Sequence, residues 1–172
     1  SRSLIEHLWR LIGLALNLAA ELENCNDYAE IFALVKRAVE KSLGEHRVGL
    51  MLYLGNLPIK VGAYHALGTN GIVLNRRLLN RISKGSPSDR RAFIFSILLH
   101  EYLHSLGYLD EREVRGLVYQ ICSENFGKDH YVTEAAFTGP WADLGEFDLE
   151  ELGDLDLELI KDFERTNHGY II

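Results

Sequence analysis

Residues 92–111 read AFIFSILLHEYLHSLGYLDE, and this stretch determines how the rest of the chain is interpreted. Its first half is almost entirely apolar, and His100 and His104 follow, four residues apart. Ser88 or Asp89 is well placed to cap a helix at its start, and the glycine of SLGYL is well placed to end it. Because residues four apart lie on one face of a helix, we expect the two imidazoles to point the same way.

Two imidazoles on one helix face can share a metal ion, with each nitrogen about 2.0–2.1 Å from a zinc. Glu101, one residue further along the helix, would lie beside such an ion without binding it. There its carboxylate can take a proton from metal-bound water and pass it to a leaving amine. A catalytic zinc needs a third protein ligand. Asp110 lies six residues after His104, beyond Gly107, where the chain can turn sharply. Asp110 is therefore the predicted third ligand, and Glu113 is the alternative.

The motif HExxHxxGxxD, which starts at His100, resembles the extended motif of the zincin metallopeptidases. It is most similar to small zincin-like proteins in which the third ligand is an aspartate followed by an acidic residue, as Asp110 is followed by Glu111. The resemblance implies that His100, His104 and Asp110 bind Zn²⁺. It also implies that Glu101 is the catalytic general base of a zinc metallopeptidase, a hydrolase of peptide bonds.

The same resemblance implies a fold. It covers roughly residues 48–125 and implies a zincin-like α+β fold, with helices packed on a small mixed β-sheet and a second helix after the active-site helix. The segment GIVLNRRLL, residues 71–79, would be a strand that edges the cleft and pairs with an extended peptide substrate. Independently, apolar spacing predicts two amphipathic N-terminal helices, and residues 47–75 are typical of about three short strands.

Two other functions stay open at this point. Bacterial metalloendonucleases that mature ribosomal RNA have the same histidine spacing, the same Gly107–Tyr108 pair and a third histidine at the position of Asp110. That family has glycine where this chain has Glu101, and a carboxylate at this position favours a peptidase. Outside enzymes, the chain could be a latent zincin-like protein that binds partners through its acidic tail.

The acidic tail is the second part of the chain. We expect residues 1–140 to form the zincin-like domain and residues 141–172 to form a C-terminal tail, docked or regulatory, with ten Asp or Glu against Lys161 and Arg165. The stretch DLEELGDLDLELIKDF, residues 148–163, could form a docking helix or strand. The favoured interpretation is a docked helix with a solvated acidic face, and the second is a linear motif for a protein partner. In a third, the tail inhibits the enzyme by placing a carboxylate or His168 at the open zinc position.

Composition further limits the class of protein and the kind of partner that we expect. The chain has 172 residues, of which 47% are hydrophobic and 25% charged, which is typical of one globular domain. The net charge of −7 and a basic run limited to residues 76–84 make a nucleic-acid partner unexpected and favour a protein or peptide substrate. The apolar run at residues 11–20 is too short to span a membrane. No secretory signal is visible, so we expect a cytoplasmic protein whose Cys25 and Cys122 stay unpaired.

Three further residues are candidates for the cleft. Tyr64 and Tyr108 could each supply a phenol that stabilises an oxyanion, although aromatic residues near turns more often serve packing. His65, in an extended segment, is a candidate to line the cleft, although a lone histidine in a strand is usually structural.

Overall fold

The computed structural model describes residues 2–65, 68–138 and 154–164. Within these residues the helices are α1 (Arg2–Glu23), α2 (Tyr28–Leu43), α3 (Arg76–Ile82), α4 (Pro87–Ser105), α5 (Glu111–Phe126) and α6 (Tyr131–Thr138). The strands are β1 (Met51–Gly55), β2 (Ala63–His65), β3 (Gly71–Asn75) and β4 (Glu158–Ile160). The α+β class with a small mixed sheet is confirmed, as are the two N-terminal helices. No helix in these segments combines the length and apolar character needed to cross a membrane.

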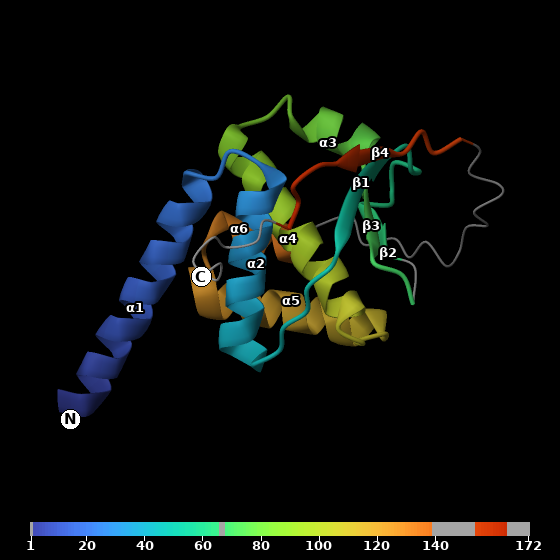
Figure 1. The fold of residues 1–172 in the computed structure, drawn as a ribbon. Coiled ribbons are helices and arrows are strands. Elements are labelled where there is room, and N and C mark those ends of the chain that lie inside the picture. The colour runs from blue at the N-terminus through green and yellow to red at the C-terminus, as the bar shows by residue number, and fades with distance from the viewer. Residues whose placement is uncertain (1, 66–67, 139–153, 165–172) are drawn as a thin grey trace, which may run out of the picture.

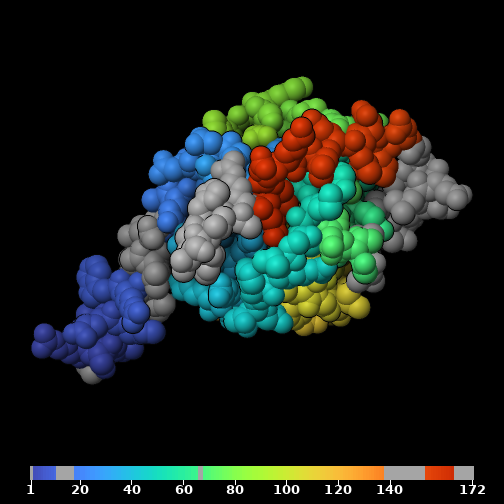
Figure 2. Space-filling view, viewed as in Figure 1, coloured from blue at the N-terminus to red at the C-terminus, as the bar shows by residue number. Residues whose placement is uncertain are grey.

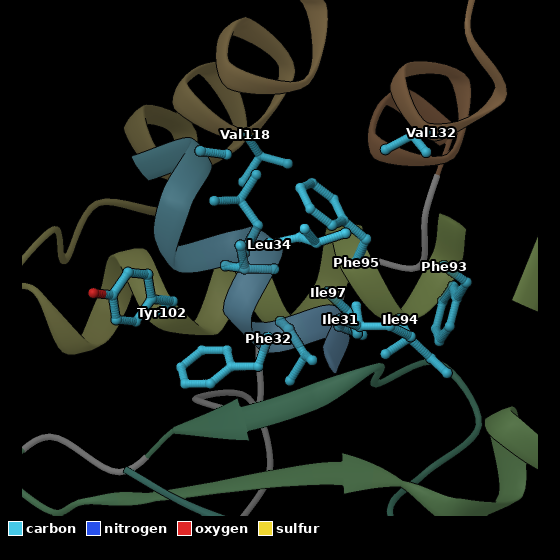
Figure 3. Close-up of a cluster of buried hydrophobic side chains, with 14 of the residues drawn as sticks. Ile31, Phe32, Leu34, Phe93, Ile94, Phe95, Ile97, Tyr102, Val118 and Val132 are labelled. Atoms are coloured by element: carbon cyan, nitrogen blue, oxygen red, sulfur yellow. The ribbon is translucent and has the colours of Figure 1, made fainter. Parts of the chain in front are cut away.

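Helix α4 is the centre of the fold (Figure 1). Every residue from Ala92 to Leu103 is buried, on all sides of the helix. A helix that is apolar all round must be surrounded by other elements, and α4 contacts α2, α5, α6 and strand β2. Figure 3 shows the resulting core, in which Phe95 and Ile97 of α4 pack with Leu34 of α2 and Val118 of α5. The helix that carries the two histidines is therefore held firmly from several directions.

The N-cap of α4 lies two or three residues before the expected positions, Ser88 and Asp89. Ser86 is the N-cap, and its hydroxyl accepts a hydrogen bond from the backbone N–H of Asp89 at 3.0 Å. Pro87 follows as the first helical residue, a position where the missing N–H of proline costs nothing. The expectation of Ser88 or Asp89 did not take into account that proline is favoured just inside a helix start.

The sheet has the strand order β2-β3-β1-β4, in which β1 and β3 are parallel and the two outer strands are antiparallel to their neighbours. Strand β3 is thus an interior strand, paired on both sides. The expectation that residues 71–79 edge the cleft is therefore wrong: residues 71–75 form β3, and residues 76–82 continue as helix α3. The edge strand that contacts α4 is β2.

Part of the acidic tail belongs to the sheet. Residues 158–160 form β4, which pairs antiparallel with β1, so the described tail contains a docked strand, which was the alternative to the favoured helix. Arg76 holds the segment by donating hydrogen bonds to the carbonyls of Asp156 (2.8 Å) and Leu54 (3.3 Å). The sheet therefore continues across the boundary expected at residue 140. Residues 139–153 and 165–172, including His168, lie outside the described residues.

Phe163 anchors the end of this strand in the core. Its ring is 4% exposed and stacks on Phe32 with a centroid distance of 4.4 Å. Phe32 in turn packs edge-on against Tyr102 of the histidine-bearing helix at 5.4 Å. We expect Phe163→Ala to lower the free energy of unfolding by about 3–5 kcal/mol, because it leaves a cavity between the tail and α2. Chemical denaturation measures this change.

The matched control is Phe137→Ala, which removes the same atoms from a side chain that is 75% exposed, and whose effect should stay within about 0.5 kcal/mol. Equal effects of the two substitutions would contradict the docking of Phe163. Deletion of residues 141–172 removes β4 and Phe163 together, so we expect it to destabilise the protein before any release of inhibition could be measured.

Candidate metal centre

A tight turn brings the start of α5 back to the end of α4. Helix α4 ends at Ser105, and Gly107 has a φ of +106°, which a residue with a side chain rarely adopts. Helix α5 begins at Glu111, with Asp110 as its N-cap. The role predicted for Gly107 is confirmed in this respect. The last turn of one helix and the first residue of the next thus face each other.

Three side chains meet across this turn. The Nε2 atoms of His100 and His104 are 3.2 Å apart. One carboxylate oxygen of Glu111 is 3.1 Å from His100 Nε2, and the other is 2.7 Å from His104 Nε2. Two nitrogens bound to one tetrahedral zinc at about 2.0–2.1 Å lie roughly 3.4 Å apart, so the imidazoles are already spaced as a pair of ligands would be. The three groups could hold a metal ion, since one ligand atom from each lies within 4.8 Å of the others.

The orientation of His104 fits this use. Its Nδ1 lies 2.7 Å from the carbonyl oxygen of Tyr108. Because a carbonyl can only accept, Nδ1 carries a proton, and Nε2 is the nitrogen turned toward His100 and Glu111. Metal-binding histidines typically donate their other ring N–H to a carbonyl or carboxylate in this way, which fixes the tautomer and the ring. The backbone of the turn therefore prepares His104 as a ligand.

The carboxylate that lies beside the two histidines is not the one predicted from the sequence. The structure places Glu111, and not Asp110, beside the histidines. The side chain of Asp110 is exposed and accepts a hydrogen bond from the backbone N–H of Arg112 at 2.9 Å, as an N-cap does. Glu113, the alternative, is exposed as well. An aspartate at the N-cap uses its short side chain locally, whereas the longer Glu111 reaches the histidines from the first helical position.

The charges of the three groups are coupled. Hydrogen bonds with His100 and His104 lower the pKa of Glu111 well below its usual range. Burial opposes protonation of His104, but the hydrogen bond to Glu111, the charge of Glu101 and the Tyr108 carbonyl outweigh it, so the pKa of His104 is raised. In the absence of a metal ion, a proton on the imidazole is thus stabilised in the place where a metal cation would bind.

This coupling predicts how metal binding depends on pH. Zinc must displace the proton of His104, whose pKa is raised above its ordinary value of about 6.5. Once the pH falls through the raised pKa, zinc affinity should fall by about tenfold per unit for each proton displaced. We expect the decline to begin above pH 6.5, and chelator competition from roughly pH 8 to pH 5 measures it. An affinity that stays constant down to about pH 6 would contradict the raised pKa.

Glu101 is buried beside the site. Glu101 is only 5% exposed, and its negative charge helps to raise the pKa of His104. Glu101 is therefore not a solvated surface carboxylate. A carboxylate that is kept from bulk water next to a metal centre is suited to proton transfer.

The strand side of the site contributes His65. His65 pairs with Ile72, which is fully buried, so its side chain lies on the sheet face that packs against the helices. Its Nδ1 donates to the carbonyl of Gly71 at 3.0 Å. Burial lowers the pKa of His65 against the hydrogen bond to Gly71, and the charges of Arg47 and, to a smaller extent, His104 add to the lowering. His65 is therefore a strand residue whose pKa responds to the charge of His104. The register of β2 and β3, which pairs His65 with Ile72, puts its side chain on the face that packs against the helices.

The two tyrosines lie elsewhere. Tyr64 pairs with Val73 on the opposite face of the sheet from His65, where both pack around Leu57 and Val61. The phenol of Tyr108 donates to the carboxylate of Glu45 at 2.6 Å. Tyr108 thus serves the centre through its backbone carbonyl.

The two cysteines are free and buried, as expected. Burial raises the pKa of Cys122, and burial, with the nearby Glu30, raises that of Cys25 to about 11. Both therefore remain protonated thiols and are poor metal ligands.

Comparison with known proteins gives no match, whether to a protein-family model, to a curated protein or to a solved structure.

Proposed function

We propose that this chain is a zinc-dependent metallopeptidase in which His100, His104 and Glu111 hold the ion and Glu101 is the general base. The observation that carries the proposal is the meeting of His100, His104 and Glu111 at 2.7–3.2 Å, with Glu101 buried beside them. Two imidazoles and one carboxylate are a common donor set for a catalytic zinc, which keeps a fourth position open. The donor set fits zinc better than calcium or magnesium, which prefer oxygen ligands.

The positions of the residues support a proposal for the reaction. A bound zinc ion lowers the pKa of a coordinated water and polarises a carbonyl group. Glu101 would take the proton of the attacking water and deliver it to the leaving amine. The tight turn at Gly107 keeps Glu111 on the histidines, and the Tyr108 carbonyl keeps His104 in the tautomer that can bind the ion.

Two features favour a peptide over RNA as the substrate. Strand β2 lies against α4 and, among the described residues, pairs on one side only, so its other edge is suited to main-chain pairing with an extended peptide. The net charge of −7 opposes binding of a polyanion. A zincin-like fold would give the same relation between an edge strand and the helix that carries the histidines.

The test is cleavage by the zinc-loaded protein, assayed on a mixed peptide library by mass spectrometry and on structured RNA in parallel. We expect new peptide termini that disappear on chelation and return when zinc is restored. Cleavage of RNA without cleavage of peptides would favour the endoribonuclease alternative. Zinc binding without either reaction would favour the latent, partner-binding protein.

A further inference from the structure

The segment that joins α2 to β1 passes alongside the turn between α4 and α5 (Figure 1). We call residues 45–50 of this segment the strap. In Figure 2 the strap (cyan) lies against the surface of that turn (yellow). The strap belongs to no helix or strand, so contacts with its neighbours must hold it in place.

Two residues of the strap hold the turn on either side of Gly107. Before the glycine, the guanidinium of Arg47 donates a hydrogen bond to the backbone carbonyl of Ser105. After the glycine, the carboxylate of Glu45 accepts a hydrogen bond from the phenol of Tyr108 at 2.6 Å. A hydrogen bond to an ionised acceptor is about twice as strong as one between neutral groups.

The strap is itself fixed by two further contacts. The backbone N–H of Arg47 donates to the phenol oxygen of Tyr102 at 2.9 Å, and Tyr102 is fully buried in α4. The backbone N–H groups of residues 49–50 donate to the carboxylate of Glu164 at 2.9 and 3.1 Å. The carboxylate of Glu45 is therefore presented to the turn from a segment that is tied to the core and to the tail.

The phenol of Tyr108 fastens a turn that has few other side-chain contacts. Gly107 gives the backbone freedom to adopt a φ of +106°. Leu109 is 59% exposed, and the side chain of Asp110 bonds only to the start of its own helix. Tyr108 packs against the core and ends on Glu45, 63 residues away in the sequence. Within the described part of the chain, Tyr108 is thus the residue of this turn whose side chain is held by a distant segment.

We propose that Glu45 is a positioning residue for His104, on which it acts through Tyr108. The residue that meets Glu45 with its phenol also offers its backbone carbonyl to Nδ1 of His104 at 2.7 Å. Holding the phenol limits rotation of the Tyr108 backbone beyond the glycine, so the carbonyl stays on the imidazole. The Nε2 atom of His104 then stays turned toward His100 and Glu111.

The inference rests on the proposed function, since it gives the metal centre a support that does not touch the ion. Groups that accept the second N–H of a metal-binding histidine fix its tautomer and orientation, and their loss typically costs about 10–100-fold in metal affinity. Glu45 stands one step behind such a group. Its loss should therefore cost less, because the Tyr108 carbonyl remains in the chain.

A double-mutant cycle on zinc affinity tests the link between Glu45 and Tyr108. We expect Tyr108→Phe and Glu45→Ala each to weaken zinc binding by about 3–10-fold, below the range for direct loss of a histidine's partner. In the Tyr108→Phe background, Glu45→Ala should have almost no further effect, because the carboxylate acts through the phenol. Competition with a chromophoric chelator measures the four affinities.

The metal-free protein gives a second readout that needs no zinc. Nδ1 of His104 carries a proton whether or not Nε2 is protonated, and in the wild type this proton should be visible by NMR and protected from exchange with water. In Tyr108→Phe and in Glu45→Ala its exchange should accelerate by about tenfold or more, because a hydrogen bond to a charged group resists local opening.

The matched controls are Glu40→Ala and Tyr119→Phe, which remove the same atoms from an exposed carboxylate on α2 and an exposed phenol on α5. Both should leave the zinc affinity and the proton exchange unchanged. Glu45→Gln keeps an acceptor for the phenol but removes the charge, so it should lose less affinity than Glu45→Ala. Tyr108→Phe keeps the packed ring and should fold with an unchanged thermal midpoint.

The outcomes separate this proposal from the proposed function. Unchanged proton exchange in both Tyr108→Phe and Glu45→Ala would overturn it, with or without zinc binding. Additive losses of zinc affinity, or equal losses in Glu45→Gln and Glu45→Ala, would also overturn it, because Glu45 would then act through its charge. A wild type that binds no zinc, yet shows a protected His104 proton that both variants lose, would refute the metal centre and confirm that Glu45 positions His104.

Discussion

Replacing Glu111 with glutamine is expected to lower zinc affinity by more than about 100-fold, whereas Asp110→Asn should leave it nearly unchanged. Loss of a residue that only supports a ligand typically costs about 10–100-fold, so loss of a charged ligand should exceed that range. Glu111 lies 2.7 Å from His104 Nε2 and 3.1 Å from His100 Nε2, while Asp110 bonds the backbone of its own helix. Competition with a chromophoric zinc chelator measures both affinities.

The Asp110→Asn variant is a matched control for structure as well as for charge. Asparagine caps helices about as well as aspartate, so α5 should keep its start and Glu111 its position. His100→Ala and His104→Ala should each abolish tight binding. If Asp110→Asn lost zinc and Glu111→Gln kept it, the assignment implied by the sequence motif would be correct, and the turn would have to rearrange on metal binding.

Replacing Glu101 with glutamine is expected to reduce peptide hydrolysis by about 10²–10⁴-fold, the range typical of a lost general base. Zinc affinity should change only a few-fold, because Glu101 is not among the three grouped ligands. Glutamine keeps the size of the buried side chain, so the variant should fold normally. The measurement is the rate of cleavage of a peptide identified from the library, at equal zinc content.

The control for this experiment is Glu124→Gln, the same substitution at an exposed position on α5, which should leave the rate unchanged. Retention of activity in Glu101→Gln would contradict the proposed role. Tolerance of Glu101→Gly together with metal-dependent cleavage of RNA would support the endoribonuclease instead.

The helix that carries the site was predictable from local features. Apolar residues before His100, a glycine after His104 and the four-residue spacing each indicate the same helix, and α4 runs through all of them. The carboxylate that joins the two histidines was not predictable, because Asp110 and Glu111 are adjacent. Asp110 caps a helix and Glu111 begins it, so either could have faced the histidines. Only the geometry of the turn shows which carboxylate points to the histidines and which one caps α5.

The errors in the sheet have a common cause, which is that strand order is a long-range property. The segment at residues 71–75 was correctly expected to be extended, but nothing in its sequence shows that β1 pairs on one side and β2 on the other. The strand at Glu158–Ile160 was one of two possibilities but was not the favoured one, because acidic residues alternate with leucines there, a pattern that also fits a surface helix. Its pairing with Leu52 to Leu54 decides between the two.

Elemental analysis of protein purified without added metal, and again after reconstitution with Zn²⁺, tests the central claim most directly. The account predicts one zinc per chain in the wild type and in Asp110→Asn, and none in His100→Ala, His104→Ala or Glu111→Gln after the same washing. A wild-type protein that holds no zinc even after reconstitution would contradict the account, because the three converging side chains would then be a hydrogen-bonded helix junction with no metal function.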